Sequence, residues 1–144
     1  MDSGRVRRLN RERIATLEEE TRELAQRHID ACGAAGIVLL VVQALRSKED
    51  QARLYAKGRT APGSVVTNAP PGWSWHNHGR AYDVAVLTDG EPDWGARTKY
   101  ISAGEIGMGL GLIWGGSVRS MQGDLGHYEY HPGTSIAEFA NDGK

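Results

Sequence analysis

The first part of the chain carries a helical pattern of apolar positions. From about residue 10 to residue 32, mainly apolar side chains recur at three- and four-residue steps, which is typical of an amphipathic helix. These positions are Ile14, Leu17, Thr21, Leu24 and His28. Gly33 and Gly36 follow as stop signals. We therefore predict one helix over residues 10–32, with a polar, flexible segment, residues 1–9, before it.

The next pattern is strand-like. Residues 37–42 form an uninterrupted run of β-branched residues and leucine, which predicts a strand buried on both faces. Ser47 is then suited to cap a helix that runs to Lys57, because Asp50 follows it three residues later in the manner of a capping box. Residues 58–75 contain several prolines and glycines, so we expect a loop there.

Short strands dominate the second half of the chain. Residues 79–87 predict a strand with two different faces. One face carries Ala81, Asp83 and Ala85, and the core-facing one carries Tyr82, Val84 and Val86. A turn is expected at residues 89–92, a helix at 94–108, and short strands at 112–114 and 127–130. This order predicts an α+β fold: a single domain over residues 1–144, with N-terminal helices packed on a small, mainly antiparallel sheet.

Composition and charge narrow the functional classes. The 144 residues carry a net charge of -1, which offers no broad attraction to nucleic acid or to anionic lipid. The single cysteine, Cys32, excludes an internal disulfide and a cysteine zinc cluster, and we expect it to be buried. The longest apolar run is too short to cross a bilayer, and the N-terminus lacks the apolar stretch of a secretory signal. We therefore expect a monomer that is cytoplasmic on synthesis and does not insert into membranes.

Four residues supply candidate chemistry. His76 and Asp83 lie seven residues apart, and Asp124 and His127 follow about forty residues later. Two imidazoles and a carboxylate can bind zinc and leave a fourth position for water, while a second carboxylate takes the proton of that water. Residues seven apart on one strand point to opposite faces, so His76 must lie in a loop before the strand. By the same parity, we expect Asp124 on a loop and His127 at the start of a strand.

Other assignments remain open at this point. His76 and His78, two residues apart, could share a strand face and bind metal together, although Asp83 then has no purpose on an otherwise apolar strand. His28 is expected to face the core or its edge, and His131 to be a surface turn residue. Tryptophans that could line a substrate groove or belong to the core are Trp73, Trp75 and Trp114.

Several segments, in order, resemble one family, the zinc D,D-/L,D-peptidases of the VanY and L-alanyl-D-glutamate endopeptidase type (peptidase family M15). Bacterial cell-wall hydrolases and phage endolysins belong to it. The matching segments are Leu45-Arg46-Ser47 with Gln51, and residues 54–60, 62–63, 66–69, 74–83, 111–116 and 124–127. The resemblance covers most of the chain beyond residue 36.

The resemblance implies a role for each matching residue. It makes His76, Asp83 and His127 the ligands of one zinc ion. It makes Asp124 the catalytic carboxylate and Arg46 a contact to the substrate or its developing oxyanion. Ser74 and Gln51 are implied to bind substrate. Two departures stand out: Gly126 replaces a usual proline, which predicts a looser loop, and His78 replaces a usual aromatic or apolar residue, which leaves a role near the metal open.

The expected function is a zinc peptidase that cuts an amide bond in the peptide stem or cross-bridge of bacterial peptidoglycan. A phage endolysin that lyses its host fits the absence of a signal sequence. The alternatives are a D-alanyl-D-alanine dipeptidase or carboxypeptidase, and a non-catalytic zinc- or cell-wall-binding domain. A nuclease suggested by the letters His-Asn-His at residues 76–78 is excluded, because the chain lacks the basic surface that such nucleases need.

Overall fold

The computed structural model describes residues 1–121 and 123–140. Its centre is an antiparallel sheet in the order β1-β2-β5-β4, with β3 paired to the far end of β2. The strands are β1 (Val38–Gln43), β2 (Ala81–Thr88), β3 (Glu91–Pro92), β4 (Ile113–Trp114) and β5 (His127–Glu129). Together with the helices, this sheet confirms the predicted α+β fold and the expected late strands.

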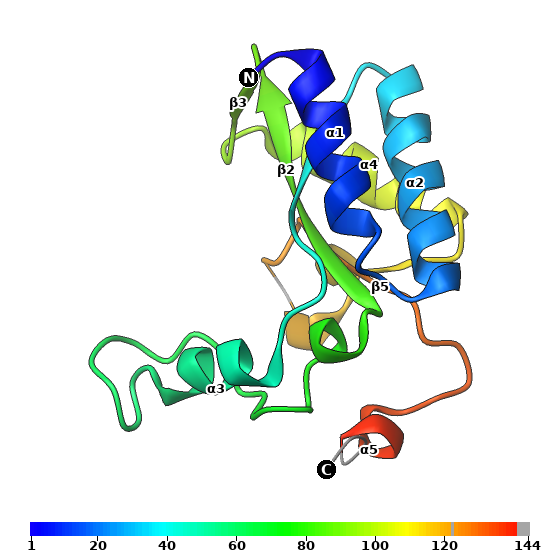
Figure 1. The fold of residues 1–144 in the computed structure, drawn as a ribbon. Coiled ribbons are helices and arrows are strands. Elements are labelled where there is room, and N and C mark those ends of the chain that lie inside the picture. Colours follow the sequence, from blue (N-terminus) through cyan, green and yellow to red (C-terminus); the bar gives the residue numbers. More distant parts are fainter. Residues whose placement is uncertain (122, 141–144) are drawn as a thin grey trace.

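The helices divide into two groups (Figure 1). The α-helices of the described residues are α1 (Ser3–Ile14), α2 (Glu19–Ala34), α3 (Lys48–Ala56), α4 (Arg97–Gly109) and α5 (Ile136–Phe139). α1, α2 and α4 lie together against the sheet, whereas α3 stands apart with the loop that follows it. Ser47 caps α3 as predicted, since its Oγ accepts a hydrogen bond from the Asp50 amide at 3.0 Å. None of these helices in the described part of the chain is long and apolar enough to span a membrane.

The N-terminal helix prediction was wrong in one respect. Instead of one helix over residues 10–32, the chain forms α1 and α2 with a break at residues 15–18. Leu17 in the break is buried, so the apolar stripe continues through it and hides the interruption. The Glu18 carboxylate caps α2 by accepting from the amides of Glu20 and Thr21. Residues 3–9, which were expected to precede the first helix, belong to α1.

Strand β1 is less buried than its sequence suggested. Leu39, Leu40 and Val41 are buried, but Val38 and Val42 are 49% and 40% exposed. The reason is that β1 is an edge strand with β2 on one side only. Asn10 of α1 covers the open edge: its side-chain amide donates to the Leu39 carbonyl at 2.9 Å and accepts from the Val41 amide at 2.8 Å. A helix thus protects an edge that would otherwise expose unpaired backbone groups.

The main core lies between the sheet and α2 and α4. Tyr82, Val84 and Val86 of β2 are buried there, as predicted for this face, and Cys32 is fully buried as expected. His28 of α2 is also fully buried. Its Nδ1 lies 2.8 Å from the Tyr82 hydroxyl, and its Nε2 lies 2.8 Å from the Ala103 carbonyl. The core therefore holds a polar pair whose hydrogen bonds are satisfied.

Candidate metal centre

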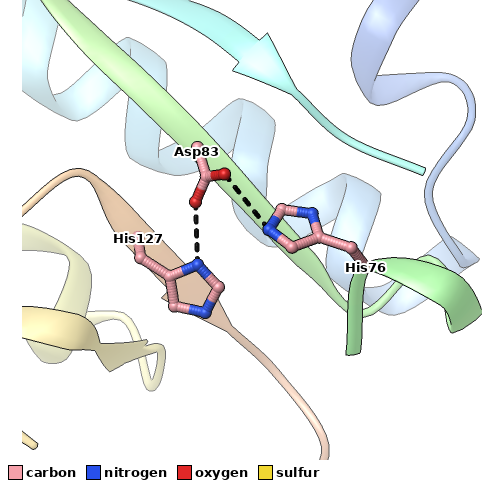
Figure 2. A group of neighbouring side chains, drawn as sticks. All are labelled: His76, Asp83 and His127. Atoms are coloured by element: carbon pink, nitrogen blue, oxygen red, sulfur yellow. Dashed lines mark hydrogen bonds and ion pairs between the residues drawn. The ribbon is translucent and has the colours of Figure 1, made fainter. Parts of the chain in front are cut away.

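Three side chains from three separate elements converge at one point (Figure 2). His76 comes from the short 3-10 helix η1 (Trp75–His78), Asp83 from β2, and His127 from the first position of β5. Asp83 Oδ2 lies 3.2 Å from His76 Nε2, and its Oδ1 lies 2.7 Å from His127 Nδ1. The three ligand atoms lie within 4.8 Å of one another. His76 thus precedes the strand and Asp124 lies on a loop, as side-chain parity required.

The local sequence fixes η1 in place. The Ser74 hydroxyl accepts from the His76 amide at 3.2 Å. Asn77 reaches back with its Oδ1, which accepts from the Gly72 and Ser74 amides, while its Nδ2 donates to the Arg46 carbonyl at 2.9 Å. η1 therefore has its own cap and is joined to the segment between β1 and α3.

Gly79 ends η1 and allows it to approach the helices. Its φ of +67° lies in the left-handed region that favours glycine. A Cβ at this position would lie 2.9 Å from the backbone nitrogen of Glu18. The Glu18 amide donates instead to the Gly79 carbonyl at 2.9 Å, so η1 is fastened to the turn between α1 and α2.

Hydrogen-bond partners select the nitrogen that each histidine presents. His76 Nδ1 lies 2.9 Å from the Ala44 carbonyl, which can only accept, so Nδ1 carries the hydrogen and Nε2 presents a lone pair. His127 Nε2 lies 2.8 Å from a carboxylate oxygen of Glu129, and its Nδ1 faces Asp83. Metal-ligating histidines characteristically donate their other N–H to a carbonyl or carboxylate. The donor set of two imidazole nitrogens and one carboxylate therefore fits a zinc ion with an open fourth position.

The electrostatics of the cluster favour a cation. Burial would raise the pKa of Asp83, but its close contacts with the His127 and His76 rings outweigh burial and hold the pKa well below its usual range. Burial opposes charge on His127 too, yet Asp83 and Glu129 together raise its pKa to about 10. Against its burial, Glu129 has its pKa lowered to about 2 by His127 and His131. Two ionised carboxylates thus surround the ligand position, which attracts a divalent cation.

Glu129 is a site residue that the sequence analysis missed. It lies two residues after His127 on β5, so both side chains project from the same face, and that spacing was the available signal. Its second carboxylate oxygen lies 2.6 Å from His131 Nε2. The His131 ring in turn stacks on Trp75 of η1, with 3.9 Å between ring centroids and 6° between planes. His131 is consequently mostly buried, and not the surface turn residue that was expected.

The alternative pairing of His76 with His78 is wrong. His78 Nε2 lies 2.8 Å from the Gly72 carbonyl, and the ring packs beside Phe139 of α5. The group of possible metal ligands found among residues 1–121 and 123–140 contains His76, Asp83 and His127, without His78.

A cleft of about 700 Å³ opens onto this cluster. Its walls include Arg46, Ser74 and Asp124 together with the three converging side chains. Burial raises the pKa of Asp124, His127 opposes that shift, and Asp83 adds to it. The Asp124 carboxylate is thus a stronger base than an ordinary aspartate, and it stands on the same wall as the cluster.

Arg46 is held by a buried glutamine. Its Nη1 donates to the Gln51 Oε1 at 3.0 Å, and Gln51 Nε2 donates to the Ala69 carbonyl at 2.7 Å. Burial lowers the pKa of Arg46, and its Nε is buried without a partner among the described residues. Gln51 is fully buried and does not line the cleft. It therefore holds Arg46, in place of the direct contact to substrate implied by resemblance.

Comparison with known proteins assigns this chain to a family. Residues 14–102 match the VanY family, described as D-alanyl-D-alanine carboxypeptidase. The peptidoglycan L-alanyl-D-glutamate endopeptidase CwlK of Bacillus subtilis is 33% identical over 122 residues, covering 76% of this chain and 72% of that protein. The chain belongs to the VanY family. The match confirms the family that the motifs resembled.

Two solved structures share this VanY-type fold. The L-Ala D-Glu endopeptidase ChiX of Serratia marcescens superposes with a TM-score of 0.61 at 19% identity, covering 85% of this chain and 86% of that one. The D,D-pentapeptidase VanY of a VanB-type vancomycin resistance cassette, a point mutant in complex with Zn(II), gives 0.60 at 20% identity, covering 87% and 84%. Helices beside an antiparallel sheet are therefore the shared framework, and the fold expectation is confirmed.

The tryptophans and the Gly126 departure have distinct structural explanations. Trp114 is a core residue whose Nε1 donates to the Leu125 carbonyl at 2.7 Å, whereas Trp73 and Trp75 line the cleft. A Cβ on Gly126 would lie 2.5 Å from the Val84 carbonyl. The Gly126 carbonyl also accepts from the Val84 amide at 2.9 Å. Gly126, two residues after Asp124, is thus in close contact with β2.

Proposed function

We propose that this protein is a zinc-dependent peptidase that hydrolyses an amide bond in the peptide part of bacterial peptidoglycan. The observation that carries the proposal is the convergence of His76, Asp83 and His127, each histidine with its second nitrogen already bonded, on the wall of a large cleft. Membership of the VanY family and the likeness to a peptidoglycan endopeptidase support the substrate class.

Each site residue receives a distinct task in this proposal. Zinc, when held by His76, Asp83 and His127, makes water acidic and the scissile carbonyl electrophilic. The Asp124 carboxylate accepts a proton from the attacking water and delivers it to the departing amine nitrogen. Its raised pKa suits this exchange, because a base closer to neutrality can both take and return a proton near pH 7.

Arg46 supplies positive charge to the same cleft. Its guanidinium is held from one side by Gln51, and the side chain lines the cleft, where it can meet an anionic group of the substrate. Such a donor can stabilise a developing oxyanion by roughly 3–4 kcal/mol, or seat a carboxylate. Ser74, whose hydroxyl also caps η1, lines the cleft and is proposed to contact substrate.

The decisive experiment measures new amino groups released from purified sacculi. Wild type, EDTA-treated protein, zinc-restored protein and Asp124→Asn are compared, with bound zinc quantified in each. We expect release by wild type, loss with EDTA, recovery with zinc, and loss in Asp124→Asn although zinc stays bound. If Asp124→Asn releases amines like wild type, the base assignment fails. If wild type binds sacculi and zinc but releases nothing, the protein is a wall-binding domain.

A carboxypeptidase is the second candidate. The family description names a D-alanyl-D-alanine carboxypeptidase, and a VanY structure in complex with D-alanine-D-alanine superposes with a TM-score of 0.60 at 19% identity. The half-buried Arg46 guanidinium at the cleft could hold a terminal carboxylate. Mass spectrometry of the products separates the two: free D-alanine indicates a carboxypeptidase, and fragments cut within the stem indicate an endopeptidase.

The biological role that we propose is lysis of a bacterial host by a phage endolysin. The support is the resemblance of the cleft motifs to those of endolysins, and the lytic consequence of cutting stem peptides throughout a wall. Turbidity of bacteria with a permeabilised outer membrane provides the test. A rapid fall with wild type and none with Asp124→Asn agrees with a lytic role. Amine release from sacculi without any fall in turbidity indicates wall remodelling.

A further inference from the structure

The two histidines of the metal centre are joined by more than one set of contacts. His76 comes from η1 and His127 from β5, and Asp83 of β2 contacts both rings (Figure 2). A metal site binds its ion tightly when packing and hydrogen bonds around the ligands hold them in position before the ion arrives. The contacts on the far side of each imidazole ring therefore bear on zinc affinity.

A series of side chains outside the ligand cluster connects the same two histidines. His127 Nε2 lies 2.8 Å from one carboxylate oxygen of Glu129, and the other oxygen lies 2.6 Å from His131 Nε2. The His131 ring stacks on Trp75, with 3.9 Å between ring centroids and 6° between planes. Trp75 directly precedes His76 in η1. This outer circuit leads from His127 through Glu129, His131 and Trp75 to His76.

The backbone holds the middle of the outer circuit in place. The Tyr130 amide donates to the Arg80 carbonyl at 2.9 Å, and the Arg80 amide donates to the Trp75 carbonyl at 3.1 Å. The residue before His131 is thus fixed beside η1. The Phe139 ring of α5 meets Trp75 edge-to-face, with 5.6 Å between centroids and 62° between planes. Trp75 therefore packs against two rings that both come from the segment after β5.

The Glu129 carboxylate is locked because both of its oxygens are engaged. The Glu129 and His131 side chains are only 11% and 15% exposed, so water offers them little alternative bonding. Since different oxygens bond His127 and His131, turning the carboxylate breaks at least one of two charge-assisted hydrogen bonds. Loss of His131 leaves one buried oxygen without this partner, and the carboxylate is then free to turn away from His127.

We propose that His131 and Trp75 are positioning residues of the metal centre. Trp75 fixes the His131 ring by stacking, and His131 fixes the Glu129 carboxylate that holds His127 in the tautomer presenting Nδ1. Through the same stack, the segment after β5 holds η1 and with it His76. The inference rests on the proposed function, in which these histidines bind zinc, and it extends the metal centre to two residues outside the ligand set.

Zinc affinity measured without substrate tests this role, because Trp75 and Glu129 also line the cleft and could alter activity by other means. Competition with a chelator gives the affinity of each variant. We expect His131→Ala to bind zinc about tenfold more weakly than wild type, the lower end of the usual cost of losing an outer partner. His131→Phe keeps a stacking ring without the hydrogen bond, and His131→Gln keeps a donor without the ring. Both should lie between wild type and His131→Ala.

A double variant distinguishes one circuit from two independent contacts. Trp75→Ala should weaken zinc binding as well, and Trp75→Ala combined with His131→Ala should lose clearly less affinity than the product of the two single losses. Trp75→Phe, which keeps an aromatic ring, should retain most of the affinity. The control is Val6→Ala, which truncates a residue buried with Leu40 and Leu87 in a separate core cluster. Urea denaturation should show that this control is less stable, while its zinc affinity equals that of wild type.

The outcomes keep the inference apart from the proposed function. Wild-type affinity in His131→Ala and Trp75→Ala, a loss no greater than that in Val6→Ala, or losses that multiply in the double variant each overturn the inference, even if the protein releases amines from sacculi. Losses in the expected order support it even if no amines are released, and then only the proposed function fails. A wild type that binds no zinc refutes both.

Discussion

The two faces of the sheet each bury a histidine, and they use it in opposite ways. Tyr82 and Asp83 are neighbours on β2, and they pair with Tyr128 and His127 of β5. On the core face, Tyr82 and Tyr128 enclose His28. On the cleft face, Asp83 and His127 form the metal centre. Because alternate residues of a strand point to opposite faces, the same two strands build both environments.

Partners, more than burial, decide the charge of these two histidines. Burial lowers the pKa of His28, whose neighbours are a hydroxyl and a carbonyl, so it is neutral. His127 is nearly as buried, yet the carboxylates of Asp83 and Glu129 raise its pKa to about 10. The core face therefore uses histidine as a neutral hydrogen-bonding group, whereas the cleft face surrounds it with the negative charge that a cation requires.

The largest loss of zinc binding and of activity is expected from removing the Asp83 carboxylate on the cleft face. Asp83→Ala deletes the group that contacts both histidines, so zinc should be lost and amine release should fall by about a thousandfold or more. Zinc content after dialysis and release from sacculi are the measurements. Val38→Ala, a truncation at an exposed position of β1 that lines neither the cleft nor a smaller cavity beside it, should keep wild-type zinc content and amine release. Retention of zinc by Asp83→Ala would show that the ligand set is wrong.

A smaller loss of zinc affinity is expected from changing Glu129, which contacts the ligand His127 and not the metal position itself. Glu129 accepts from His127 Nε2 and holds the tautomer that presents Nδ1. Losing such a partner typically weakens metal binding by about 10–100-fold. The loss of zinc affinity should be about 100-fold in Glu129→Ala and about tenfold in Glu129→Gln, because glutamine keeps an acceptor oxygen for His127 Nε2. Competition with a chelator measures the affinity. Glu138→Gln, on exposed α5, should bind zinc like wild type, and equal affinity in all three variants would refute this role.

Sequence patterns predicted the core face better than the cleft face. Periodicity was sufficient for Tyr82, Val84 and Val86, and parity correctly placed His76 before its strand. Periodicity failed at Leu17, because a buried residue in the turn preserved the helical stripe across the break. The cleft face depends on contacts between distant segments.

Gln51 illustrates this limit on the cleft face. Its burial behind Arg46 follows from the path of residues 58–75, which no local pattern specifies. The contact of Glu129 with His131 and Trp75 had a local signal only in its first step, the spacing from His127.

A change on the core face should affect stability and spare activity. His28 Nε2 donates to the Ala103 carbonyl, so Nδ1 accepts from the Tyr82 hydroxyl. Tyr82→Phe leaves that buried acceptor without its partner, which should cost about 1–2 kcal/mol in the free energy of unfolding. Urea denaturation measures the loss, and amine release should equal that of wild type. A variant as stable as wild type, or one that loses zinc, would show that the two faces are not separate.

The smallest effect is the part of the pH dependence of stability that His28 contributes on the core face. Because the pKa of His28 is lowered from 6.5, the unfolded chain takes up a proton before the folded protein does as pH falls. The contribution is therefore fully present above pH 6.5 and is lost below it, by at most about 1.4 kcal/mol at pH 5.5. His127, with its raised pKa, contributes fully below pH 6.5 and loses part of its contribution as pH rises above it, in wild type and in His28→Gln alike, so the difference between the two proteins isolates His28. Urea denaturation of zinc-free protein at pH 7.5, 6.5 and 5.5 should show that the free energy of unfolding of wild type falls relative to that of His28→Gln as pH falls. Parallel profiles for the two proteins would mean that other groups cause any pH dependence and that His28 does not remain neutral through its contacts with Tyr82 and Ala103.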